Sequence, residues 1–220
     1  MLANDTQQLT RSLVTGLAPV QPLPGPWVRA AAWCAISMLV VCAIAFVVAS
    51  TTSAGAHADR RIVVQQLAAL ATGFTAAAAA FATTVPGYRR WIVVLPLVPL
   101  AVWLGDLGRS CLQDALASGP SSSSLVEHWG CVPATMLFGA IPAWAIVIML
   151  RRGAPLTPGL TTVLAALAAS GLANVGVRFV HEADASIVVL AWHVTALLVI
   201  SALSATAGRS LFNWRQFTAA

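Results

Sequence analysis

The stretch VRAAAWCAISMLVVCAIAFVVAS, residues 28–50, decides how the rest of the sequence is interpreted. It contains a single charged residue, Arg29, and is long enough for an α-helix to cross the hydrocarbon core of a bilayer, which takes about 20 residues. It begins behind a polar, proline-rich segment, unlike the apolar core of a cleavable signal peptide. We therefore expect it to remain in the protein as a membrane anchor.

Composition extends this interpretation to the whole chain. Of the 220 residues, 59% are hydrophobic and only 9% are charged, whereas soluble domains contain about 25% charged residues. A soluble globule of this size has too little interior to bury so much apolar surface. Further apolar runs follow at Ile62–Val85, Trp91–Leu104, Val132–Leu150, Gly159–Val180 and Ile187–Ala207. We therefore predict an all-α, polytopic membrane protein with six transmembrane helices, of which the third contains Pro96 and Pro99.

The arginines predict the orientation of these helices. With a cytoplasmic N-terminus, eight arginines fall inside and four outside; the inside ones are Arg11, Arg29, Arg89, Arg90, Arg151, Arg152, Arg209 and Arg215, and the outside ones are Arg60, Arg61, Arg109 and Arg178. This bias follows the positive-inside rule and predicts that both termini lie in the cytoplasm. Because the arginines are scattered between apolar runs, we expect no direct contact with nucleic acid.

The same topology divides the chain into three parts. Residues 1–27 form a cytoplasmic N-terminal segment, residues 28–208 form the membrane domain, and residues 209–220 form a cytoplasmic tail. The largest outside loop lies near residues 105–131. A homo-oligomer is compatible with this architecture.

The N-terminal segment contains a short amphipathic helix. Asp5 and Gln8 have the spacing of a helix N-cap and its capping-box partner. Leucines then recur every four residues with a valine beside them, and together they define a leucine face consisting of Leu9, Leu13, Val14 and Leu17. A helix of about 12 residues is marginal alone in water, so this face requires a surface to cover.

A proline-rich spacer separates that helix from the membrane. It contains Pro19, Pro22, Pro24 and Pro26, a composition typical of a stiff, extended chain. The pattern favours a docking peptide that binds a cytoplasmic partner by helix-in-groove contact, with a frayed tail as the alternative.

The cysteines fall into two groups. Cys34 and Cys42 lie in the first apolar run, where we expect buried, small hydrophobic side chains. Cys111 and Cys131 lie in the outside loop, and three interpretations remain open for them. The first is a structural disulfide that stabilises the fold by about 3 kcal/mol. The second is a redox or thiol sensor. The third is a copper or zinc site that they form with His128, His181 and His193.

No catalytic motif is recognisable in the sequence. It contains no nucleophile elbow, phosphate loop, HExxH or dinucleotide fingerprint, so we expect no enzyme. Transporters usually have ionisable groups within the membrane, and the apolar runs have none near their centres. The alternatives to a binding protein are a small transporter or permease-like protein, for which the prolines of the third and fourth runs argue, and a thiol oxidoreductase that uses Cys111 and Cys131.

Six short stretches resemble one known family. They are PVQPLPGPW at 19–27, WGCVP at 129–133, RRGAP at 151–155, HEADAS at 181–186, WH at 192–193 and GRSLFNW at 208–214. Their order and spacing are similar to those of the NrsF-type membrane proteins, and the likeness spans almost the whole chain. Members of that family are six-span anti-sigma factors for extracytoplasmic-function sigma factors.

The resemblance implies a mechanism. The N-terminal segment would hold a sigma factor at the membrane, away from RNA polymerase, and an outside signal linked to metals or oxidants would release it. Cys131 lies where a family cysteine is expected. Many relatives have a second cysteine directly after the histidine that aligns with His181, but this sequence has Glu182 there. The resemblance therefore leaves Cys111, or His181 with Glu182, as the group that acts with Cys131.

Overall fold

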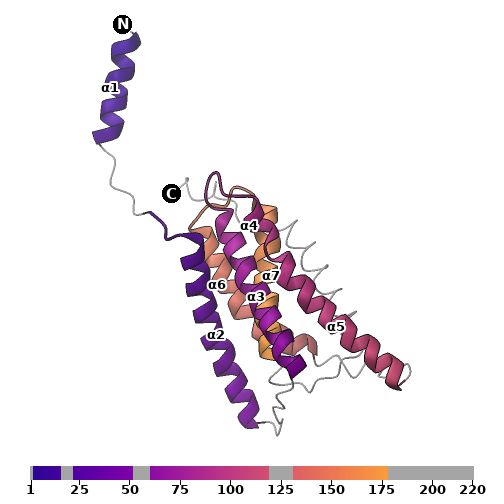
Figure 1. Ribbon diagram of the computed structural model, residues 1–220. Coiled ribbons are helices and arrows are strands. Elements are labelled where there is room, and N and C mark those ends of the chain that lie inside the picture. Colours follow the sequence, from indigo (N-terminus) through magenta and orange to yellow (C-terminus); the bar gives the residue numbers. More distant parts are fainter. Residues whose placement is uncertain (1, 16–21, 52–59, 119–130, 178–220) are drawn as a thin grey trace.

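A computed structural model describes residues 2–15, 22–51, 60–118 and 131–177. Within these ranges every regular element is a helix (Figure 1), as the sequence predicts. The helices are α1 (Leu2–Thr15), α2 (Pro26–Thr51), α3 (Arg60–Ala82), α4 (Trp91–Val94), α5 (Leu97–Ser118), α6 (Cys131–Arg151) and α7 (Pro158–Val177). The predicted sixth run and the C-terminal tail lie outside the described residues.

Four stretches have the length and composition needed to cross a bilayer. They are Pro26–Val48, Val63–Ala82, Trp91–Ser110 and Pro158–Val177, which correspond to the first, second, third and fifth apolar runs. The fourth run is represented by the shorter apolar stretch Met136–Arg151 within α6. These helices are consistent with a membrane protein, while the total of six spans remains a prediction.

Pro96 explains why the third run is divided into two helices. It has no backbone N–H and so cannot continue the hydrogen-bond ladder of α4, which ends at Val94. The ladder resumes where the Leu100 N–H donates to the Pro96 carbonyl at 3.1 Å. α5 then continues to Ser118, so the first half of the segment that we assigned to the outside loop is helical.

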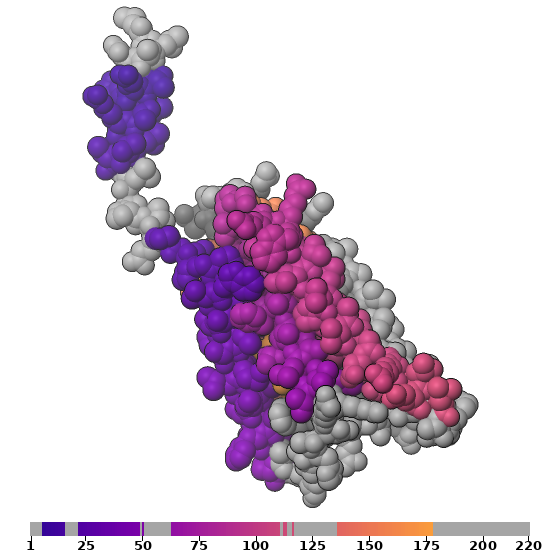
Figure 2. Space-filling model, in the orientation of Figure 1, coloured from indigo at the N-terminus to yellow at the C-terminus, as the bar shows by residue number. Residues whose placement is uncertain are grey.

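The centre of the bundle is the packing of α3 against α7. A Cβ atom built on Gly171 would lie only 2.7 Å from the Ala69 carbonyl oxygen and 2.9 Å from the Gly73 Cα. Small residues at such a crossing allow the two backbones to approach closely, which is how membrane helices gain packing energy. The alanines at 76–80 continue the contact and are fully buried. On the face shown in Figure 2, α2 and α5 flank α3.

The outer surface of the bundle is apolar. Leu39 and Phe46 on α2 are 73% and 77% exposed, and α5 likewise exposes Val98 and Leu116. A water-soluble monomer rarely exposes an apolar surface of this extent, whereas lipid-facing helices require one. Cys42 is also exposed, so our expectation that it is buried was wrong, because its position on α2 faces away from the other helices.

Substitution of Gly171 by alanine should destabilise the bundle. The added methyl group would force α3 and α7 apart, and overpacking of this kind costs about 1–3 kcal/mol. Thermal unfolding in detergent micelles, followed by far-UV circular dichroism, measures the effect. Gly105→Ala is the matched control, because a Cβ there meets nothing within 4 Å. Equal melting temperatures for the two variants would contradict the close crossing.

Candidate functional site

α1 presents an exposed apolar face on which none of the described helices packs. Leu9, Leu13 and Val14 are 62%, 64% and 59% exposed, and in Figure 1 the helix stands apart from the bundle, at the end where α2 begins. Leu17, the last member of the leucine face, lies outside the described residues. The helix begins at Leu2, so Asp5 lies within it and our assignment of Asp5 as the N-cap was wrong. The helix simply extends one turn further than the capping pattern indicates.

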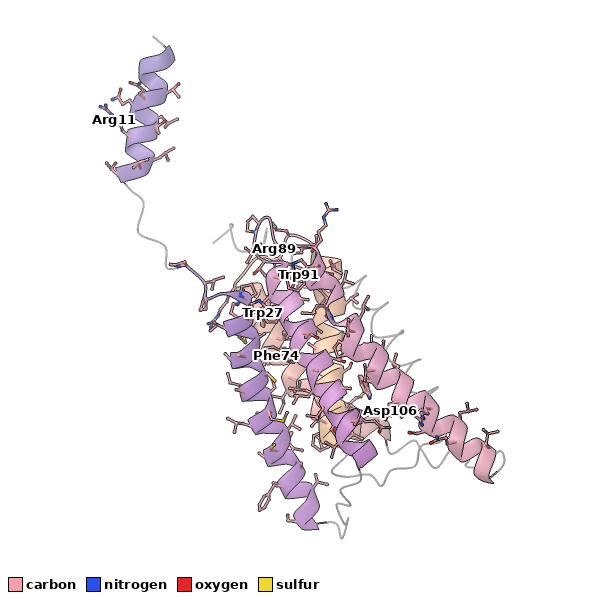
Figure 3. The ribbon with its side chains drawn as sticks, viewed as in Figure 1. Arg11, Trp27, Phe74, Arg89, Trp91 and Asp106 are labelled. Carbon is pink, nitrogen blue, oxygen red and sulfur yellow. The ribbon has the colours of Figure 1, made fainter. Side chains whose placement is uncertain are left out.

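One end of the bundle is rich in arginine. α2 and α7 begin there, and α3 and α6 end there (Figure 1). Figure 3 places Trp27, Arg89 and Trp91 at this end. We call this the arginine-rich end. It is defined by four exposed arginines that lie in the two connecting turns or directly beside them: Arg89, Arg90, Arg151 and Arg152. Exposed Trp27 and Trp91 beside them match the aromatic belt found at membrane–water interfaces.

Arg29 is buried at this end, with only 6% of its surface exposed. Its guanidinium donates to the Met149 carbonyl at 2.6 Å and to the Thr84 hydroxyl at 3.1 Å, and its Cζ lies 4.4 Å from the centroid of the Phe81 ring. The Met149 carbonyl is in the last turn of α6, where carbonyls lack a helical partner. Arg29 therefore caps α6 while it is fixed between α3 and α6. From the sequence we assigned Arg29 only a topological role.

Trp33 lies one turn after Arg29 and makes the second polar contact between α2 and α6. Its indole N–H donates to the Pro142 carbonyl at 3.0 Å, and its side chain is fully buried. Pro142 lies inside α6 and has no N–H, so the helical partner of the Phe138 carbonyl is missing. Trp33 thus binds α6 at the residue where its hydrogen-bond ladder is weakest.

Two threonines join α3 to α7 at the same end. The hydroxyl oxygens of Thr83 and Thr161 lie 2.6 Å apart and are buried. The Leu156 N–H, just before α7, donates to the Thr83 carbonyl at 3.2 Å. These contacts hold the turn between α6 and α7 against the end of α3, beside the start of α2.

The two predicted sensing cysteines lie in helix segments at the opposite end of the bundle. Cys111 lies in the last two turns of α5 and Cys131 is the first residue of α6, and these two helix ends lie at the same end of the bundle in Figure 1. His128, His181 and His193 fall outside the described residues, so their proximity to the cysteines remains a prediction. In the described ranges, no three histidine, cysteine or acidic side chains gather in a way that would hold a metal ion.

Three buried polar atoms in the described ranges have no hydrogen-bond partner. They are Ser37 Oγ, Gln66 Oε1 and Asp106 Oδ2. Asp106 lies on α5, farther from the arginine-rich end than Trp91 (Figure 3). Polar groups inside a membrane span are often functional, but these three come from separate helices, α2, α3 and α5.

Comparison with known proteins identifies the family. The family model NrsF, described as negative regulator of sigma F, matches residues 13–214. The chain belongs to this family. No match was found among curated proteins or among solved structures. The resemblance inferred from the short stretches is confirmed, and the chain is a negative regulator of a sigma factor.

The extent of the NrsF match bears on the two candidate regions. It covers every described membrane helix and the segments that hold all five predicted sensing residues. In α1 it includes Leu13 and Val14, whereas Leu9 precedes it. The family description names a regulatory role, that of a negative regulator of a sigma factor.

Removal of the threonine contact should weaken this NrsF-family bundle. Thr83→Val retains the shape of the side chain but removes the hydroxyl, and hydrogen bonds between membrane helices contribute about 0.6–1.7 kcal/mol. We expect a lower melting temperature in detergent. Adding Thr161→Val should cost little more, because the two hydroxyls form one contact.

Thr75→Val is the matched control for this measurement, because the Thr75 hydroxyl bonds only to carbonyls of its own helix. Additive losses in the Thr83→Val and Thr161→Val double variant would contradict a direct contact between the two threonines.

Proposed function

We propose that this chain is a membrane-bound anti-sigma factor that sequesters an extracytoplasmic-function sigma factor through the leucine face, Leu9, Leu13, Val14 and Leu17. The observation that carries the proposal is an amphipathic helix whose apolar side chains are about 60% exposed. A groove on the partner would accept such a helix by its regularly spaced anchors. Sigma factor bound in this way is held at the membrane and kept from RNA polymerase.

The proposed orientation places the arginine-rich end in the cytoplasm. Arg89, Arg90, Arg151 and Arg152 lie in the short turns at that end, which is where the positive-inside rule counts charge most reliably. α1 is attached to the same end, and so it faces the compartment that contains sigma factors. With six spans in a bacterial inner membrane, the C-terminus returns to the cytoplasm as well.

The proposed signal acts at the opposite end, in the envelope. Cys111 and Cys131 supply thiols, and His128, His181 and His193 supply imidazoles, which together suit either oxidation or binding of copper or zinc. Release requires that the signal changes the affinity of α1 for the sigma factor. A coupling of about 1–3 kcal/mol is typical for two such sites and corresponds to a five- to 150-fold change.

Two rival functions make different predictions. A small transporter would tolerate loss of residues 1–27, because all but the last two of them precede α2, the first membrane helix, which begins at Pro26. A thiol oxidoreductase would lose turnover when Cys111 or Cys131 is replaced. The family description as a negative regulator of a sigma factor supports the anti-sigma proposal over both.

Capture of the sigma factor encoded beside this gene tests the proposal. The full-length protein in detergent should retain it, and a chain that lacks residues 1–27 should not. Leu9→Asp combined with Leu13→Asp places two charges on the leucine face and should weaken capture by about tenfold or more, as loss of a hot spot does.

Gln8→Asp combined with Thr15→Asp is the matched control, because it adds the same charges on the opposite side of α1. This control variant should capture sigma factor as well as the parent does. No capture by the intact protein, under reducing and oxidising conditions alike, would exclude the proposed function and favour transport.

Replacement of Cys131 should uncouple the signal from release. We expect Cys131→Ser to capture sigma factor normally and to keep it when a thiol oxidant or copper is added, since the reacting sulfur is gone. Cys42→Ser is the control, because Cys42 lies on the exposed face of α2 and should not affect release. Release that is unchanged in Cys131→Ser would argue against this cysteine as the sensor.

A further inference from the structure

We propose that Arg29 and Trp33 couple the position of α6 to the junction between the N-terminal segment and α2, so that a change at the Cys131 end of α6 reorients that segment. The biological meaning of this coupling rests on the proposed function. The coupling itself is a property of the membrane domain and can be measured without a sigma factor.

α6 is suited to transmit a displacement between the two ends of the bundle. It begins at Cys131 and ends at Arg151, and one continuous helix joins the sensing end to the arginine-rich end. A hydrogen-bonded helix resists compression along its axis, so a displacement of its first turn reaches its last turn unless the helix bends. The last turn of α6 contains the Met149 carbonyl, which Arg29 holds at 2.6 Å.

Pro142 marks the weakest point in the hydrogen-bond ladder of α6. The Phe138 carbonyl has no helical N–H to accept from, so the ladder is weakest between Phe138 and Pro142. Trp33 donates to the Pro142 carbonyl itself. One turn further along α2, Ser37 is 1% exposed and its hydroxyl has no partner in the described residues. Within the described residues, the polar contacts between α2 and α6 thus lie from Pro142 to the arginine-rich end.

Arg29 cannot simply remain in place if α6 moves. A guanidinium that loses its carbonyl partner in a low-dielectric site is an uncompensated buried charge, which is strongly unfavourable. It must follow the Met149 carbonyl or turn toward water at the nearby interface. These are two discrete arrangements of one side chain, which is what a two-state coupling requires.

The junction between the N-terminal segment and α2 is held by the same residue, Arg29. The Arg29 N–H donates to the Gly25 carbonyl at 3.1 Å and so fixes the last spacer residue to the first turn of α2. Trp27, two residues before Arg29, packs on Phe74 of α3 with ring centroids 6.0 Å apart. A rotation of this turn therefore changes both the direction in which the spacer leaves the membrane and the environment of Trp27.

Trp27 provides the readout. We would label the eight tryptophans of the full chain with 5-fluorotryptophan and assign the Trp27 fluorine resonance with Trp27→Phe. The parent carries Cys34→Ser, Cys42→Ser and Cys111→Ser, so that Cys131 is the only thiol. Two perturbations of α6 are compared, which are N-ethylmaleimide on Cys131 and the substitution Cys131→Phe. At least one should shift the Trp27 resonance by more than its line width.

The variants of Arg29 decide the proposal. Arg29→Gln removes the charged clamp and should abolish the shift, whereas Arg89→Gln removes an exposed arginine at the same end and should leave it unchanged. If Arg29→Gln does not fold, Arg29→Lys decides, because lysine keeps the charge but cannot span both acceptors, and the shift should shrink. No shift with either perturbation, or an equal shift in the Arg29 variants, overturns the coupling.

Sigma-factor capture by the same samples separates the two proposals. A Trp27 response that depends on Arg29, in a chain that captures no sigma factor, supports the coupling and excludes the proposed function. Normal capture and release without any Trp27 response supports the proposed function and overturns the coupling.

Discussion

The close approach of α3 and α7 at Gly73 and Gly171 is the contact on which the rest of the bundle depends. α2, α4, α5 and α6 all contact one of these two helices, and α2 and α6 contact both. Lipid provides little hydrophobic force to drive helices together, so their association relies on close packing and on polar contacts between helices. The two kinds of contact lie at different levels of the bundle. The close packing at the glycines lies farther from the arginine-rich end, and the polar contacts lie toward that end; they are made by Arg29, Trp33, Thr83 and Thr161.

Much of the fold could be predicted from the sequence because lipid imposes a simple length rule. The apolar runs that begin at Val28, Ile62, Val132 and Gly159 correspond within a few residues to α2, α3, α6 and α7. The leucine face was also predictable, since Leu9 and Leu13 need only a regular helix to align. The sequence shows that Pro96 disturbs the third run. It does not show whether the helix kinks there or divides into two helices, because neighbouring contacts determine that outcome.

The partners of single residues could not be predicted. Arg29 was visible as the only charge in its run, but nothing in the sequence indicates that it reaches a carbonyl 120 residues away in the chain. The same applies to Trp33 and Pro142, because three-dimensional register between distant helices depends on every intervening turn. Cys42 was misjudged for a related reason, since all sides of a membrane helix are apolar and the sequence does not distinguish lipid from protein.

The marginal stability of α1 has a consequence for gene dosage. A helix of 14 residues is only partly formed in water, so any partner that binds it must offset the cost of ordering it. The affinity that remains for a given contact area is then reduced. Under the proposed function, the fraction of sigma factor held by such a helix would rise gradually with the number of regulator molecules in the cell, without the sharp threshold that tight binding produces.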